Sequence, residues 1–141
     1  MARVSSFVFC DSVQVQQTPE GTQFWQIINP LQVLSPYAIP GAFSFAFSCG
    51  VNEFDTDEDN VLNIQFSDPE GTVLNDSGSI NIPAFPEGLG HLPKSFRSIM
   101  FNVDFRNLPI KHRGLYSLAI NMNGEQIGEF KIPAFQSEQG I

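Results

Sequence analysis

The sequence predicts an all-β domain, folded as a sandwich or a barrel. Several stretches alternate apolar and polar residues with a period of two, which is the pattern of strands that rest one face on a core. Turn signals containing glycine and proline separate these stretches, and no long apolar set recurs at helical spacing. Together the three observations predict about 7–9 strands.

The first two strands follow from the N-terminal quarter of the chain. Residues 3–15 are a first extended run, and QTPEG at 17–21 predicts a turn. The second run, 23–34, is interrupted by Pro30. Proline cannot donate a ladder hydrogen bond, so we expect Pro30 to lie at an edge or a bulge.

The third and fourth strands have the clearest alternation. In the third, small residues separate an apolar set formed by Phe43, Phe45, Phe47 and Cys49. An acidic loop, 52–60, then leads to a strand whose apolar set is Leu62, Ile64 and Phe66. SDPEG at 67–71 predicts the next turn, because proline presets the φ angle of the second turn position.

The next segment holds a run, a loop and a further strand. Residues 72–85 form a further extended run that contains a proline at 83. Residues 86–94 predict a longer loop. The strand that follows turns one apolar set inward, namely Ile99, Phe101, Val103 and Phe105. Residues 108–114 then lead into the final hairpin.

Residues 116–132 predict a β-hairpin with one extra residue in its second strand. Asn123 and Gly124 both tolerate positive φ, so they suit a two-residue type I′ turn. Counting outward from the turn requires one register shift to keep apolar residues opposite each other. The predicted partners are Met122 with Glu125, Ile120 with Ile127, Leu118 with Phe130 and Tyr116 with Ile132, with the bulge at Gly128–Glu129.

Composition bounds the class of protein. A chain of 141 residues predicts one domain, and its 14 Phe against 2 Tyr and 1 Trp predict a core rich in phenylalanine. The net charge of −8 argues against a nucleic-acid partner, because affinity for phosphate backbones comes mainly from Lys and Arg. No apolar run of about 18 residues occurs, so we expect no membrane partner.

The N-terminus and the cysteines bear on the compartment. Residues 1–16 lack the sustained apolar region of a signal peptide, so we expect a cytoplasmic protein. In that compartment Cys10 and Cys49 are expected to be reduced, buried thiols. A Cys10–Cys49 disulfide stays open as the alternative, because sequence cannot decide pairing.

Residues 113–120, RGLYSLAI, resemble the tyrosine corner of immunoglobulin-like domains, in which a tyrosine begins the penultimate strand and bonds to a nearby loop. Leu118 stands where antibody domains carry a cysteine, so no inter-sheet disulfide is implied. More widely, Cys10-Asp11, the turn at 67–71 and GLYSLAINMNGEQIG near the end resemble a family of small bacterial immunoglobulin-like proteins of unknown function. The resemblance implies an immunoglobulin-like antiparallel β-sandwich with Greek-key connections, and it implies no activity.

The acidic loop suggests calcium. Asp55, Asp57 and Asp59 have the spacing of the first three ligands of an EF-hand loop. The twelfth position holds Phe66 instead of the bidentate glutamate, and no helices are predicted around the loop. A solvated loop is the alternative interpretation, and the stronger one.

Basic residues and both histidines cluster between residues 91 and 113. The candidate ligand-binding residues there are His91, Lys94, Arg97, Lys111, His112 and Arg113. If the two ends of this segment meet, they form a cationic patch suited to a small anionic ligand or nucleotide. Ordinary surface charge is the alternative, and the patch could also contact the acidic loop of a second copy.

No motif for catalysis occurs. Neither histidine has an Asp or Cys at motif spacing, and GxSxG, HExxH, GxGxxG and P-loop patterns are absent, so we expect no enzyme and no cofactor. The leading hypothesis is a binding or assembly module that contacts a protein partner, or a copy of itself, through sheet edges and end loops. Capture of an anionic ligand by the basic segment and calcium-dependent binding are the alternatives.

Overall fold

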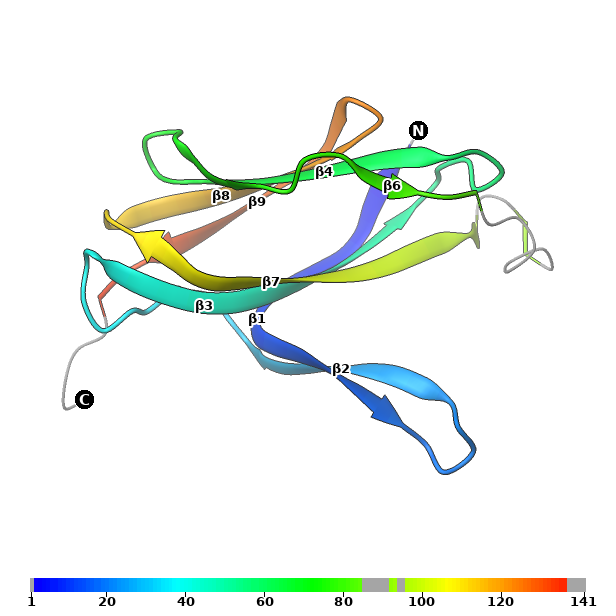
Figure 1. Ribbon diagram of the computed structural model, residues 1–141, viewed down its shortest axis with the longest axis horizontal. Helices are drawn as coiled ribbons and strands as arrows, with labels where there is room; N and C mark the ends of the chain where they lie inside the picture. Colours follow the sequence, from blue (N-terminus) through cyan, green and yellow to red (C-terminus); the bar gives the residue numbers. More distant parts are fainter. Residues whose placement is uncertain (1, 85–91, 94–95, 137–141) are drawn as a thin grey trace.

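The computed structural model, described for residues 2–84, 92–93 and 96–136, contains two antiparallel sheets and nine strands (Figure 1). The strands are β1 Arg3–Gln17, β2 Gln23–Pro30, β3 Gly41–Asn52, β4 Asn60–Ser67, β5 Val73–Asp76, β6 Ile80–Ile82, β7 Ser98–Ile110, β8 Gly114–Met122 and β9 Glu125–Ala134. One sheet has the order β2-β1-β3-β7, and the other has β5-β4-β8-β9 with β6 also paired to β4. Nowhere in the described ranges is there a helix long and apolar enough to cross a bilayer.

The topology is that of an immunoglobulin-like sandwich, as predicted. Strands β1, β3 and β7 take the places of A, B and E, and they face β4, β8 and β9 in the places of C, F and G. The predicted tyrosine corner is present, because the Tyr116 hydroxyl donates to the His112 carbonyl oxygen at 2.7 Å. This bond ties the start of β8 to the loop that precedes it.

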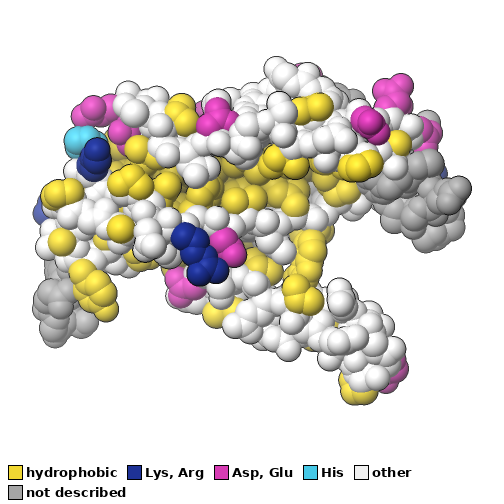
Figure 2. All heavy atoms as spheres, viewed as in Figure 1, with side chains coloured by type: hydrophobic (Ala, Val, Ile, Leu, Met, Phe, Trp, Pro, Cys, Tyr) yellow, Lys and Arg dark blue, Asp and Glu magenta, His cyan; other side chains and the backbone are white. Residues whose placement is uncertain are grey.

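The core lies between the two sheets, where Figure 2 shows hydrophobic side chains gathered along the seam. The predicted inward sets of β3 and β4 are confirmed: Phe45, Phe47 and Phe66 are almost fully buried, and Phe43 packs against the core. Rings from both sheets meet directly, because Phe66 lies 5.4 Å from Phe45 between ring centres. Burial of these rings supplies the main stabilisation of the fold.

The closing hairpin has the predicted turn and a displaced bulge. Asn123 and Gly124 have φ of 53° and 81°, as a type I′ turn requires. The pairs Met122–Glu125, Leu118–Phe130 and Tyr116–Ile132 are confirmed. The predicted pair Ile120–Ile127 and the predicted bulge at Gly128–Glu129 are wrong, because Ile120 lies opposite Gly128 and Ile127 is the extra residue. A Cβ on Gly128 would lie 3.0 Å from Val4 Cγ2, so this glycine allows β9 to pack closely on β1.

Strand β7 runs further than predicted, through Ile110. A bulge at Asn107, with φ of 53°, accommodates one extra residue relative to β3, and the Asn107 N–H donates to Ser44 Oγ at 2.9 Å. The bulge turns Leu108 and Ile110 into the core, where both are buried. Residues 108–110 are therefore part of the sheet, and the connection to β8 is shorter than expected.

The first hairpin leaves the sandwich. Strand β1 pairs with β3 only from Arg3 to Cys10, and with β2 only from Cys10 to Gln17. Residues 11–29, called the arm below, therefore form a two-stranded ribbon that projects from the body (Figure 1). The predicted turn at its tip is confirmed: Thr18 N–H donates to the Thr22 carbonyl and Gly21 has φ of 90°.

Candidate functional site

Among the candidates of the basic segment that the structure describes, Arg97 is the one with a hydrogen bond or ion pair to the acidic loop. Its guanidinium donates to Thr56 Oγ1 at 3.0 Å and to the Leu92 carbonyl at 3.1 Å, and it lies 3.5 Å from an Asp57 carboxylate oxygen. Thr56 is fully buried and Arg97 nearly so. Within the chain, Arg97 thus links the acidic loop to the start of β7, and a contact of the basic segment with the acidic loop of a second copy stays a prediction.

The other two aspartates of the calcium hypothesis bind backbone groups. Asp55 accepts the Asp57 N–H at 2.9 Å, and Asp59 accepts the Ala84 N–H at 2.9 Å. Among the described residues, no three His, Cys, Asp or Glu side chains gather in a way that could hold a metal ion. Calcium binding by Asp55, Asp57 and Asp59 therefore stays a prediction without geometric support in this part of the chain.

The remaining basic candidates are not brought together with Arg97. Lys111, His112 and Arg113 follow the last residue of β7, whereas Arg97 precedes its first residue, so a strand of 13 residues separates them. The His112 imidazole lies 3.9 Å from Glu70 and is half exposed. His91 and Lys94 fall outside the described residues. A joint cationic patch is therefore not present among the described candidates, and anion binding stays a prediction.

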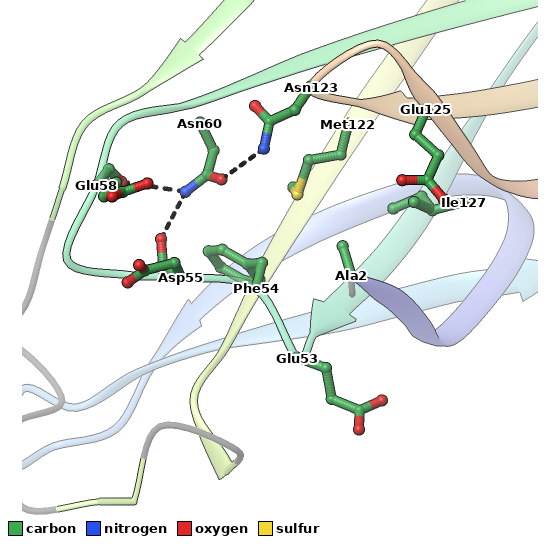
Figure 3. A pocket seen from close by; sticks show the side chains of 10 residues that line it. All are labelled: Ala2, Glu53, Phe54, Asp55, Glu58, Asn60, Met122, Asn123, Glu125 and Ile127. Carbon is green, nitrogen blue, oxygen red and sulfur yellow. Dashed lines mark hydrogen bonds between the residues drawn. The ribbon is translucent and has the colours of Figure 1, made fainter.

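A pocket of about 240 Å³ adjoins the acidic loop (Figure 3). Phe54, Met122 and Ile127 contribute apolar walls, and four carboxylates stand at its rim: Glu53, Asp55, Glu58 and Glu125. Asn60 braces the pocket, because its side-chain amide donates to the carbonyls of Asp55 and Glu58 and accepts from Asn123. The sequence identified the acidic loop but not the β8–β9 turn that completes this pocket.

The arm has one apolar face. Register places Val13 opposite Ile27 and Val15 opposite Trp25, and alternation puts all four side chains on the same side. Val15, Trp25 and Ile27 are 58%, 43% and 39% exposed, which is unusual for three large side chains in one cluster. Nearer the body, Val13 is partly buried and lines a hollow that the arm shares with β3 and β7.

The arm is also nearly free of charge. Of its residues only Asp11 at the base and Glu20 at the tip are charged. In Figure 2 the arm is white and yellow except for acidic atoms at its end. Native edge strands are commonly protected by lysine or by bulges, and β2 has neither between Gln23 and Ile28. The sequence analysis predicted contacts through strand edges in general, and the scarcity of charge in residues 11–29 was the signal that could have located the arm.

The two cysteines are free, buried thiols, as expected. They lie on different faces of the same sheet, because Cys49 belongs to the core and Cys10 does not. Burial raises the pKa of the Cys49 thiol to about 12, and burial followed by the charges of Asp11 and Asp104 raises that of Cys10. Both thiols are therefore poor nucleophiles, because the thiolate is the reactive form.

Comparison with solved structures shows the fold and nothing more. The chain resembles part of the alkylpurine DNA glycosylase AlkC of Pseudomonas fluorescens, solved bound to DNA with an abasic site analogue: TM-score 0.52, 9% identity, 94% of this chain covered. The match spans only 30% of the glycosylase chain. An immunoglobulin-like protein of Pseudomonas aeruginosa aligns at TM-score 0.47 and 10% identity over 96% of this chain and 97% of its own.

Comparison of sequences identifies the family. No protein with curated information matches the chain. A family model matches residues 5–135, which is nearly the whole chain and includes the arm, both sheets and the closing hairpin. The chain therefore belongs to the family of unknown function DUF6941.

Proposed function

We propose that this protein is a non-enzymatic binding module whose contact surface is the arm. The observation that supports the proposal is the apolar face of the ribbon, on which Val15, Trp25 and Ile27 are exposed beside Val13. An isolated two-stranded hairpin is marginally stable in water. A partner that covers this face would remove apolar surface from water and hold the ribbon in place.

The proposal is tested by comparing two sets of lysine variants. Val15→Lys and Ile27→Lys place a charge on the apolar face, while Val61→Lys and Val73→Lys place the same charge at similarly exposed valines of the other sheet. We expect the arm variants to lose association, measured by light scattering and by retention of lysate proteins on the immobilised chain. Circular dichroism and the melting temperature should change little, because none of these side chains belongs to the core.

Two results would contradict the proposal. A wild-type protein that stays monomeric and retains no protein would do so. So would association that the Val61→Lys and Val73→Lys variants lose and the arm variants keep.

The alternatives have weaker support. Among the described candidates, Lys111, His112 and Arg113 would serve the capture of an anionic ligand, because Arg97 is engaged with Thr56 and Asp57. Thermal shift with phosphate and nucleotides would support that alternative if Lys111→Glu and Arg113→Glu removed the stabilisation. The same assay with calcium addresses the aspartates of the acidic loop.

A further inference from the structure

We propose that the partner of the arm is a second copy of this chain, and that two arms pack apolar face to apolar face in an antiparallel dimer. The inference rests on the proposed function, because it names the occupant of the same surface. Two features carry it: the distribution of charge and the pairing of side chains on the face.

Charge selects the arm as the place where two copies meet. Each copy carries a net charge of −8, so two bodies repel each other at long range. Within the arm only Asp11 at the base and Glu20 at the tip are charged. Two arms can therefore approach with little repulsion. A strongly basic partner would find few carboxylates here, since Glu20 is the only one beyond Asp11.

The side chains on the face form two unequal pairs. Near the tip, Val15 lies opposite Trp25, and nearer the body Val13 lies opposite Ile27. In an antiparallel stack, the large tip pair of one copy lies over the smaller base pair of the other, and the two-fold axis repeats the contact. All four side chains are then covered in both copies.

The unequal pairs also decide between the two possible orientations. A stack with both tips at the same end would place the two Val15–Trp25 pairs against each other, and it would bring Glu20 next to Glu20 and Asp11 next to Asp11. The antiparallel stack places a large pair over a small pair at both ends. The opposite face of each ribbon carries Ser12, Gln14, Gln16 and Gln26, which stay in water, together with Phe24 and Ile28.

The expected dimer is weak. Two ribbons that meet over four side chains each bury less than the roughly 1,200–2,000 Å² of a stable specific interface. We therefore expect a dissociation constant in about the micromolar range. Control variants for the test can be placed in the same two strands, because neighbouring positions of a strand point to opposite faces of the ribbon.

Sedimentation equilibrium of the full chain, from about 1 to 300 µM, tests the inference by a dissociation constant. We expect Val15→Lys and Ile27→Lys each to raise this constant about tenfold or more. Gln14→Lys and Gln26→Lys add the same charge on the opposite face and should leave it within about twofold. Val15→Thr keeps the β-branched shape of valine, so it provides a milder substitution if Val15→Lys disturbs the ribbon.

Each other outcome overturns the inference. If none of the four lysine variants changes the dissociation constant, the dimer forms through another surface. If all four raise it by the same factor, the two copies pair through their strand edges. A chain that is monomeric at every concentration does not pair with itself. In that last case the proposed function survives if Val15→Lys and Ile27→Lys abolish retention of a different protein, and it fails if they do not.

Discussion

The body and the arm are built from the same kind of sequence but differ in what covers them. In β3 the alternating set includes Phe45, Phe47 and Cys49, which are at most 2% exposed because the second sheet lies over them. In the arm an equally regular set includes Val15 and Trp25, and both are exposed. Alternation therefore determines which side chains share a face, while the path of the chain determines whether anything covers that face.

The largest expected effect comes from removing one phenylalanine from each region. Phe47→Ala should lower the free energy of unfolding by about 3–5 kcal/mol, because it empties a fully buried site. Phe24→Ala, at a position 49% exposed, should cost less than about 1 kcal/mol. Urea denaturation measures both values. Equal losses would remove the distinction between body and arm.

A smaller effect is expected at the arginine that fixes the acidic loop. Arg97→Ala leaves buried Thr56 without its partner, so we expect a loss of about 1.5–3 kcal/mol in the free energy of unfolding. Arg106→Ala is the matched control, because Arg106 is exposed and lies 3.8 Å from Asp104; its loss should be about 0.5 kcal/mol or less. A cost at Arg97 no greater than at Arg106 would show that the buried contact contributes nothing.

The two tyrosines of the chain provide a third comparison between a buried and an exposed side chain. Tyr116→Phe removes the hydroxyl that donates to His112, and it should lower the free energy of unfolding by about 0.5–1.5 kcal/mol. Tyr37, the only other tyrosine, is 79% exposed, so Tyr37→Phe should have no measurable effect. Thermal unfolding of the two variants side by side tests the pair. Identical melting temperatures would contradict a structural role for the corner.

The smallest expected effect is a dependence of the free energy of unfolding on pH, caused by buried groups of the body. Burial raises the folded-state pKa of Cys49 to about 12 from an ordinary 9.0, so between these values the unfolded chain binds fewer protons than the folded one. Stability from this group is complete below pH 9 and is lost as pH rises towards 12. Tyr116, whose pKa burial also raises, contributes in the same direction.

A variant isolates the contribution of the thiol. In Cys49→Ala the free energy of unfolding should fall less steeply with alkaline pH than in the wild type, whatever the offset caused by the lost side chain. Chemical denaturation at several pH values gives the two slopes. Parallel slopes would mean that the thiol is accessible to solvent in the folded state.

Local patterns predicted most of the body. Period-two alternation identified the inward residues of β3, β4, β7 and β8, and Asn123-Gly124 identified the last turn. What the patterns missed depends on contacts distant in sequence. The bulge lies beside Gly128, which approaches Val4 of β1, and the partner of Arg97 lies 41 residues away.

The arm was missed for the same reason. A run such as 11–17 reads as a strand whether or not a neighbour continues beside it, and only the register with β3 shows that pairing stops at Cys10. The basic segment illustrates the reverse error. Lys111 and Arg97 are close in sequence, but the strand between them is extended and carries them to opposite ends of the sheet.

The fluorescence of Trp25 tests the central claim most directly, because it is the only tryptophan of the chain and lies on the apolar face of the arm. If two arms cover each other, its emission should shift to shorter wavelength and resist acrylamide quenching as the protein concentration rises. Ile27→Lys should abolish that change and Gln26→Lys should preserve it. Emission that is the same at every concentration while the sedimented mass doubles would contradict the account.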